Sequence, residues 1–300
     1  MLSSAKYRGR FAPSPTGPLH FGSLVAALGS YLDAKHHNGT WLVRMEDLDT
    51  PRSAAGAADS ILHTLERFGL HWDEEVIYQS QRTDAYDAAL HQLQASNTAY
   101  LCSCTRKEIA DSGLHGIEGQ IYPGTCRNGH PSGREGRAWR VRTDKNPIHF
   151  DDALQGRITQ RLESESGDFV VKRADGLFAY QLAVVVDDAF QKITHVVRGA
   201  DLLVSTPRQI HLQRLLGLPT PKYLHLPVAL NAQGEKLSKQ TLAQPIDNVH
   251  PTRVLTQALV FLQQKPPAQL ADYDVTSILN WAIQNWNRKS LHRIENFIYT

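Results

Sequence analysis

A short stretch near the N-terminus combines the residue types of a phosphate-binding loop. Pro13, Pro15 and Gly17 exclude regular structure there, and the apolar residues after Ser23 recur at helical spacing. A rigid loop between a strand and a helix N-terminus suits an anion, because backbone N–H groups and the helix dipole point into it. His20 and Ser23 add side-chain donors at the same end. The pattern predicts phosphate binding, and the alternative is an ordinary turn with an exposed histidine.

A second loop far along the chain carries two lysines, Lys236 and Lys239, next to a glycine. A glycine-containing loop with two cations three residues apart could close over a polyphosphate. The alternative for this segment is an exposed surface loop.

Charged side chains also follow the predicted strands. Glu46 comes directly after one strand, and Arg198 lies at the end of another. In parallel sheets, ligands bind beyond the carboxyl ends of the strands. We therefore expect Glu46 to contact a ligand and Arg198 to fork onto a carboxylate. The alternatives are helix capping for the acidic group, and an ion pair with Asp201 or Asp187 for the arginine.

The cysteines form a separate cluster in a glycine-rich segment with little periodicity. The chain contains three: Cys102, Cys104 and Cys126. An odd, clustered number argues against a disulfide framework, and an irregular segment of this length needs something to hold it. Zinc is the economical answer, with three thiolate ligands. General chemistry favours His115 or His130 as the fourth ligand, with Tyr122 an unusual candidate. The alternative is three reduced structural cysteines.

The elements that must position these residues alternate between strands and helices. A βαβ order near the N-terminus predicts a parallel sheet with right-handed crossovers. Residues 177–188 are the most apolar stretch and must be core, as helix or strand, with Tyr180 as a polar handle. The other predicted strands are 6–11, 40–45, 134–142, 147–150, 157–162, 169–173, 193–201 and 223–230, and the predicted helices are 24–36, 54–68, 82–97, 206–216, 251–264 and 274–286.

The composition describes a globular chain without a strong overall charge. Of 300 residues, 41% are hydrophobic and 21% charged, with a formal net charge of +2, so any basic surface must be local. Alternation predicts that Arg140 and Arg142 share one strand face, which could follow a phosphate backbone or form a solvated edge. No secretory signal or membrane-length apolar run is evident. We therefore expect a cytoplasmic protein with no membrane partner.

Four segments together resemble a known family. Residues 10–23 are similar to the first signature of class I aminoacyl-tRNA synthetases in its glutamyl form, and Lys236-Leu237-Ser238-Lys239 is similar to the second. Residues 42–49 and 197–201 also resemble the glutamyl enzymes. The whole chain, including its Cys-x-Cys and Tyr-x-x-x-Cys segments, resembles their truncated relatives, the glutamyl-queuosine tRNA(Asp) synthetases.

The resemblance implies an α/β fold. It is a Rossmann-like doubly wound parallel sheet of the class I aminoacyl-tRNA synthetase type, with a zinc-containing insertion and a small C-terminal helical region. We expect a monomer without an anticodon-binding domain. The implied division is 1–99 and 169–240 for the halves of the catalytic domain, 100–168 for the zinc-binding insertion with acceptor-side strands, and 241–300 for the C-terminal helices.

The resemblance also implies the substrates and the residues that bind them. ATP, with Mg²⁺, would activate L-glutamate to glutamyl-adenylate, and the glutamyl group would pass to the queuosine base of tRNA(Asp). The implied catalytic residues are His20 and Lys239. ATP would be bound by His20, Gly22, Ser23, Lys236 and Lys239, glutamate by Arg10, Phe11, Ala12, Pro13, Ser14, Glu46, Tyr180 and Arg198, and one zinc ion by Cys102, Cys104, Tyr122 and Cys126.

Three other functions compete with this prediction. A shortened glutamyl-tRNA synthetase would charge tRNA(Glu) at its 3′ end. A catalytically silent RNA-binding paralogue would keep the fold, but it has no chemical need for the charged residues. An amino-acid ligase of the same fold with a non-RNA acceptor is the hardest to exclude, because the basic strip near Arg140 is modest.

Overall fold

The computed structural model describes residues 6–117, 119–131, 133–230, 245–291 and 296–298. Its helices are α1 (Phe21–His36), α2 (Ala57–Arg67), α3 (Thr83–Ala95), α4 (Arg106–Asp111), α5 (Leu162–Glu165), α6 (Tyr180–Phe190), α7 (Thr206–Leu216), α8 (Pro251–Phe261) and α9 (Val275–Asn285). Its strands are β1 (Arg8–Phe11), β2 (Thr40–Met45), β3 (Ile77–Tyr78), β4 (Ala99–Cys102), β5 (His115–Gly116), β6 (Gly119–Gln120), β7 (Ala138–Val141), β8 (Ile148–Asp152), β9 (Gly156–Gln160), β10 (Phe169–Lys172), β11 (His195–Gly199), β12 (Lys222–Leu226), β13 (Val228–Leu230) and β14 (Asn296–Ile298).

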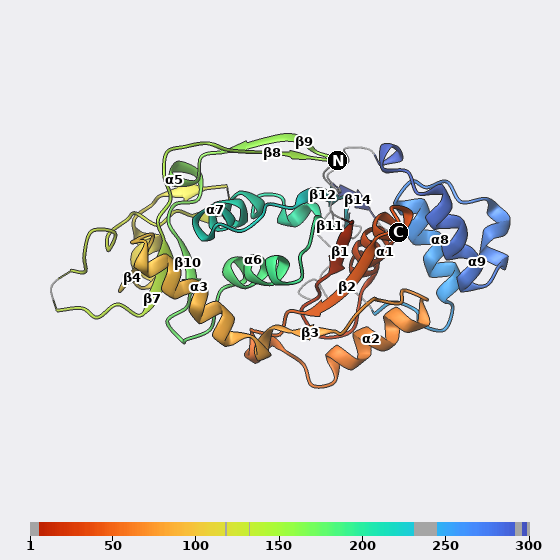
Figure 1. Cartoon of the computed structure of the whole chain (residues 1–300), viewed down its shortest axis with the longest axis horizontal. Helices are drawn as coiled ribbons and strands as arrows, with labels where there is room; N and C mark the ends of the chain where they lie inside the picture. Colours follow the sequence, from red (N-terminus) through yellow and green to blue (C-terminus); the bar gives the residue numbers. More distant parts are fainter. Residues whose placement is uncertain (1–5, 118, 132, 231–244, 292–295, 299–300) are drawn as a thin grey trace.

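Parallel strands occupy the middle of the molecule (Figure 1). Strand β1 pairs in parallel with β2, and β2 with β3, while β11 pairs in parallel with β12. The two groups meet where the Thr194 amide donates to the Arg8 carbonyl at 3.0 Å, which sets β11 beside β1. Parallel pairing brings the carboxyl ends of β1, β2, β11 and β12 to one edge, as the βαβ pattern predicts.

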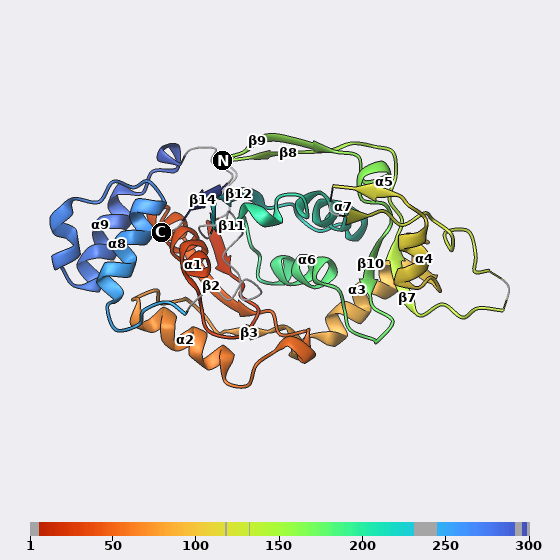
Figure 2. The same cartoon turned by 180° about the vertical axis from the view of Figure 1, so that it is seen from behind.

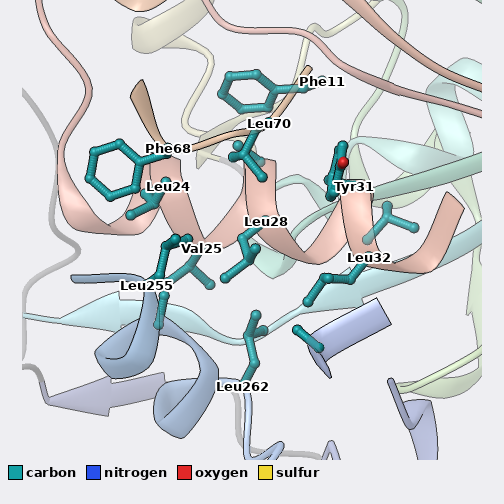
Figure 3. Close-up of a cluster of buried hydrophobic side chains, with 14 of the residues drawn as sticks. Phe11, Leu24, Val25, Leu28, Tyr31, Leu32, Phe68, Leu70, Leu255 and Leu262 are labelled. Atoms are coloured by element: carbon teal, nitrogen blue, oxygen red, sulfur yellow. The ribbon is translucent and has the colours of Figure 1, made fainter. Parts of the chain in front are cut away.

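Helix α1 is buried between the parallel strands and the C-terminal helices. Leu24, Val25 and Leu28 are almost completely buried, and Figure 3 shows them between Phe68 on one side and Leu255 on the other. A helix enclosed on several sides needs small and apolar residues around most of its circumference, which explains its alanine-rich sequence. The C-terminal helices α8 and α9 therefore share one core with the N-terminal strands.

A buried carboxylate fastens the C-terminal helices to α1. Asp33, on α1, accepts hydrogen bonds from Trp286 Nε1 at 2.9 Å, from Arg288 Nη2 at 2.7 Å and from the hydroxyl of Tyr7. These donors outweigh the effect of burial and hold the pKa of Asp33 below its ordinary value.

At the end of the molecule away from the C-terminal helices, the strands pair antiparallel, as Figures 1 and 2 show from both sides. Strands β10, β7 and β4 form one sheet there, whereas the antiparallel hairpin of β8 and β9 lies nearer the middle, where it touches β12 at Asp152 (Figures 1 and 2). The predicted basic strip is wrong here, because β7 is the central strand and Arg140 is buried with its guanidinium 4.0 Å from the centre of the Tyr122 ring. The Nη1 atom of Arg140 donates to the Asp168 carbonyl, so the guanidinium is bound inside the protein.

Several element boundaries differ from those predicted. Helix α1 begins at Phe21, ahead of the predicted residue 24, because His20 caps it. The apolar stretch 177–188 becomes helix α6, and the predicted strand 223–230 breaks at Pro227, which has no N–H to donate to a ladder. Strand β10 pairs with β7 across the expected boundary after residue 168. The division into domains stays a prediction.

Candidate active site

One cavity of about 790 Å³ opens at the carboxyl ends of β1, β2, β11 and β12. The sequence-predicted ligand-binding residues that fall within the described part of the chain all line it: Arg10, Phe11, Ala12, Pro13, Ser14, His20, Gly22, Ser23, Glu46, Tyr180 and Arg198. The structure therefore brings together residues that are up to 188 positions apart in the sequence. A cavity of this size has room for a nucleotide and a small amino acid.

His20 occupies the N-cap of α1 at the edge of this cavity. Its Nδ1 accepts a hydrogen bond from the Ser23 amide at 3.2 Å. The neutral ring then carries its proton on Nε2, which is the nitrogen able to donate to a phosphate oxygen. The sequence predicts N–H groups open to an anion at this helix start, but the Ser23 amide is instead satisfied by His20. The anion-binding capacity comes from the dipole and the remaining groups of the first turn.

Backbone contacts fix the loop before His20. The Pro13 carbonyl accepts from the Glu46 amide at 2.9 Å, and the Pro15 carbonyl accepts from the Ala54 amide at 3.0 Å. The Ile246 amide donates to the Leu19 carbonyl at 3.1 Å, which brings the chain that follows residue 244 next to the loop. The predicted lysines 236 and 239 lie outside the described residues.

Ion pairs hold one part of the cavity lining, and we call this group the ion-paired wall: Arg10 and Glu46 line the cavity, and Arg44 and Asp188, which are not among its lining residues, pair with them. Asp188 Oδ1 accepts from Arg10 Nε at 3.1 Å and from Arg44 Nη1 at 2.9 Å. Arg44 Nη2 also donates to Glu46 Oε1 at 3.2 Å, and the Arg44 side chain is 0% exposed. Such charges are tolerated in the interior because each has a partner of opposite sign.

The two carboxylates of this wall differ in pKa direction. Burial raises the pKa of Glu46 above its ordinary value, and the nearby charges of Arg44 and Arg10 only partly oppose that effect. For Asp188, burial also acts upward, but Arg10 and Arg44 outweigh it and hold its pKa below the ordinary value. Asp188 is therefore held as a carboxylate by the two arginines of the wall. The charged form of Glu46 would be stabilised further by a cationic ligand.

A second part of the lining is centred on an arginine held by neutral groups, and we call this group the neutral-acceptor wall: Arg198 and Tyr180 line the cavity, and Thr206, Gln209 and His225 hold the arginine from behind the lining. Arg198 Nη2 donates to Thr206 Oγ1 and to Gln209 Oε1, both at 2.8 Å, and Nη1 donates to the Tyr180 hydroxyl at 3.2 Å. Its Nε donates to His225 Nε2 at 3.1 Å.

Of the two alternative partners for Arg198, Asp201 and Asp187, the structure excludes Asp187. Asp187 accepts instead from Arg82 Nε at 2.7 Å, from Gln79 and from the Tyr86 hydroxyl at 2.8 Å. The positive charge of Arg198 therefore faces the cavity while neutral side chains hold its guanidinium in place.

Sequence reasoning missed four residues that support the site: Arg44, Asp152, Asp188 and His225. Arg44 carried a signal, since an arginine inside an apolar strand next to Glu46 must be buried with a partner. The sequence also gave a signal for Asp188, because it is an acidic residue at the end of the most apolar stretch. Asp152 and His225 gave no local signal, because their contact joins residues 73 positions apart.

The predicted metal ligands also meet in space. The thiol sulfurs of the three cysteines lie within 4.8 Å of one another. Among the described residues, these cysteines form the cluster of His, Cys, Asp or Glu side chains that could hold a metal ion. The Tyr122 hydroxyl lies 3.4 Å from Cys102 Sγ and 3.7 Å from Cys104 Sγ, and it accepts from the Cys126 amide at 2.8 Å. Three thiols that converge in this way resemble the cysteine-rich donor sets of structural metal sites, whereas a phenol oxygen beside them is an unusual addition.

The electrostatics of this cluster favour a thiolate at Cys126. Burial acts against it, but hydrogen bonds from Ser103 and His130 lower the pKa of Cys126 to about 5. Burial is also the main cause that raises the pKa of Cys104, to about 11. Of the two histidines considered as fourth ligand, His115 is exposed and bonded to the Gly113 carbonyl, whereas His130 lies within hydrogen-bond reach of Cys126.

Comparison with known proteins defines the class to which this fold and site belong. Residues 6–263 match the family model described as tRNA synthetases class I (E and Q), catalytic domain. A glutamate tRNA ligase from Elizabethkingia meningosepticum, solved in complex with its amino acid, superposes with a TM-score of 0.75 at 26% identity. The superposition covers 96% of this chain and 66% of that one, so this chain spans about two thirds of its length.

More similar relatives narrow the assignment. The glutamyl-Q tRNA(Asp) synthetase of Dechloromonas aromatica is 59% identical, with 97% of each chain covered, and that of Chromobacterium violaceum is 58% identical, with 95% of each covered. The chain therefore belongs to the glutamyl-Q tRNA(Asp) synthetase family within the class I synthetases. No helix among the described residues is long and apolar enough to cross a membrane.

Proposed function

We propose that the chain activates L-glutamate with ATP and transfers the glutamyl group to the queuosine base in the anticodon of tRNA(Asp). The observation that carries the proposal is the composition of the cavity. It sets a capped helix N-terminus for phosphates beside an arginine whose charge is not neutralised and a buried glutamate. The names of the two similar relatives, both glutamyl-Q tRNA(Asp) synthetases, support the acceptor.

Glutamate binding follows from counting donors and charges. Arginine has five N–H hydrogens, and Arg198 uses four of them on protein acceptors. The fifth, on Nη1, and the hydroxyl hydrogen of Tyr180 remain for an acceptor-only group, which describes a carboxylate. Because the α-carboxylate must stay free to react, the side-chain carboxylate of glutamate takes this place. Glu46 then receives the α-ammonium group.

Activation requires no side-chain nucleophile. An oxygen of the glutamate α-carboxylate attacks the α-phosphorus of ATP, and the bond from that phosphorus to pyrophosphate breaks. His20 Nε2 and the first turn of α1 hold the phosphate oxygens, and Lys239, helped by Lys236, neutralises the leaving pyrophosphate. These groups act by positioning and by stabilising developing charge. ATP enters with Mg²⁺ as its counter-ion.

Transfer completes the reaction. A hydroxyl oxygen of the queuosine base attacks the carbonyl carbon of glutamyl-adenylate, AMP leaves with the electron pair of the broken C–O bond, and the hydroxyl proton passes to solvent or phosphate. The new ester joins glutamate to the base.

The decisive experiment supplies labelled glutamate, ATP and total tRNA prepared from cells with or without queuosine. We expect label only on queuosine-containing tRNA(Asp), in a linkage that survives mild deacylation of the 3′ ester. Label on tRNA(Glu) would replace the proposal with charging of that tRNA. Glutamate-dependent pyrophosphate exchange without label on any RNA would point to a non-RNA acceptor.

Zinc held by Cys102, Cys104, Cys126 and Tyr122 is the second part of the proposal. The metal would cross-link β4 to the loop that contains Tyr122 and Cys126, a structural role typical of a site with four protein ligands. Metal analysis should give one zinc ion per chain. Loss of zinc in His130→Ala together with full retention in Tyr122→Phe would contradict the assignment of the fourth ligand.

The proposal describes a monomer that works in the cytoplasm. Sedimentation of the purified chain with and without tRNA tests the first point, since a dimer at micromolar concentration would contradict it.

A further inference from the structure

Two buried side chains behind Arg198 form a line of hydrogen bonds that leads away from the cavity. Arg198 Nε donates to His225 Nε2 at 3.1 Å, and His225 Nδ1 lies 2.7 Å from Asp152 Oδ2. The side chains of His225 and Asp152 are both 0% exposed. Both stand behind the described residues that line the cavity, so they can act on a ligand only through the arginine.

Asp152 is built to remain ionised. Its carboxylate accepts from the backbone amides of Leu154 at 2.9 Å, Gln155 at 2.8 Å and His225 at 3.1 Å. Burial acts to raise the pKa of Asp152, but the hydrogen bonds from His225 and these amides lower it below the ordinary value. A carboxylate with several N–H donors keeps its charge even when buried.

The charge of Asp152 selects one tautomer of His225. Burial, together with the positive charge of Arg198, lowers the pKa of His225 to about 4, so the ring is neutral at pH 7. A neutral imidazole has one proton, and Nδ1 must carry it, because its neighbour Asp152 can only accept. The lone pair on Nε2 then faces the Arg198 N–H. The opposite tautomer would set a lone pair against the carboxylate and two N–H groups against each other.

We propose that Asp152 and His225 are positioning residues for Arg198. They fix the guanidinium so that its remaining Nη1 hydrogen and the Tyr180 hydroxyl face the carboxylate of the substrate. The inference rests on the proposed function, because it takes the glutamate side chain as the group that Arg198 binds.

The imidazole explains how Arg198 is held firmly without losing its charge. On the ion-paired wall, Asp188 contacts Arg10 and Arg44 directly and offsets their charge. Behind Arg198, the carboxylate stands one ring further away and acts through a neutral acceptor. The arginine gains a fixed orientation, and its positive charge stays available to an incoming anion.

The tautomer can be measured in the unmodified protein. Long-range proton–nitrogen correlation spectra should show a neutral His225 protonated on Nδ1 at pH 7. A ring protonated on Nε2, or on both nitrogens, would overturn the proposal whatever the variants do.

Two substitutions of His225 separate positioning from packing. In His225→Asn, an amide near the Nδ1 position still reaches Asp152, but Arg198 Nε loses its acceptor. In His225→Gln, an amide oxygen near the Nε2 position restores that acceptor. The matched control is His211→Asn, which changes another buried histidine, on α7, that bonds to the Arg142 carbonyl.

Glutamate-dependent pyrophosphate exchange measures the effect. We expect His225→Asn to raise KM for glutamate by about tenfold or more, the loss of one charge-assisted hydrogen bond. KM for ATP should stay close to wild type, His225→Gln should recover most of the loss, and His211→Asn should leave KM for glutamate unchanged. Equal changes in both KM values, or equal effects in His225→Asn and His211→Asn, would contradict positioning. A wild type without glutamate-dependent exchange would refute the proposed function instead, and the tautomer would then be the test of the inference.

Discussion

The two walls of the cavity hold arginines in opposite ways. The ion-paired wall sets Arg10 and Arg44 against Asp188 and Glu46, so its charges balance within the protein. The neutral-acceptor wall holds Arg198 with side chains that carry no charge at pH 7, and the carboxylate of Asp152 acts on it through the ring of His225. The same residue type thus forms ion pairs within the protein in one wall, and in the other it is the group that we propose binds the substrate carboxylate.

This difference predicts which property of the protein a substitution in each wall should change. Removing one partner of a buried ion pair leaves a charge with no compensation, which destabilises the fold. Removing a charged group that pairs with a ligand should change the stability of the fold little and lower the affinity for that ligand strongly. The variants of Asp188 and Arg198 test whether stability and affinity separate in this way.

The largest effect should come from Asp188→Ala, which leaves Arg10 and Arg44 buried without their shared anion. We expect the free energy of unfolding to fall by about 3–5 kcal/mol. Urea denaturation provides the measurement. The matched control is Asp87→Ala on α3, which removes a half-exposed partner of Lys172 and should cost less than about 1 kcal/mol. Equal losses in the two variants would remove the distinction between the walls.

Arg198→Ala should act on affinity. We expect kcat/KM for glutamate to fall by roughly a hundredfold, since a buried charged group that pairs with the substrate is lost. KM for ATP should remain near the wild-type value, which is the internal control. A large fall in the urea midpoint with intact glutamate binding would show that Arg198 is structural.

Acid should weaken the neutral-acceptor wall before the ion-paired wall. The pKa of His225 is lowered from 6.5 to about 4, so its contribution to stability is complete above pH 6.5 and is lost as the pH falls toward 4. At pH 5 the loss should be about 2 kcal/mol. The lowered pKa of Asp188 gives a contribution that persists until the pH falls below its ordinary value of 3.8.

The control for this pH effect is His225→Gln, which cannot titrate. His195, whose pKa burial also lowers to about 4, contributes in the same range in both proteins and cancels in the difference. Parallel stability curves for wild type and His225→Gln between pH 7 and 5 would refute the prediction.

The smallest effect should come from Lys239→Ala, which belongs to neither wall. We expect glutamate-dependent pyrophosphate exchange to fall by at least about tenfold, or about 1.4 kcal/mol of barrier. Because the lysine acts on the leaving pyrophosphate, kcat should change more than KM for glutamate. Activity equal to wild type would exclude Lys239 from the site.

Local patterns in the sequence selected three residues that line the cavity: His20 from a loop before a helix start, and Glu46 and Arg198 from strand ends. Arg10 also lines the cavity, but it was predicted only through the family resemblance. Local patterns gave wrong predictions where the neighbouring elements decide whether a residue is buried. Arg140 looks like part of an exposed basic strip, but a strand on each side of β7 buries it against Tyr122.

The sequence by itself determined the parallel α/β class, the family and the residues at the mouth of the site, because these depend on periodicity, turn residues and short motifs. Only the tertiary structure decided how those residues are held. The contact between Asp152 and His225 joins the β8–β9 hairpin to β12, and the carboxylate of Asp188 joins β1 to β2 through their arginines. Such contacts depend on elements distant in sequence, and no local pattern specifies which acid will meet which base when both are buried.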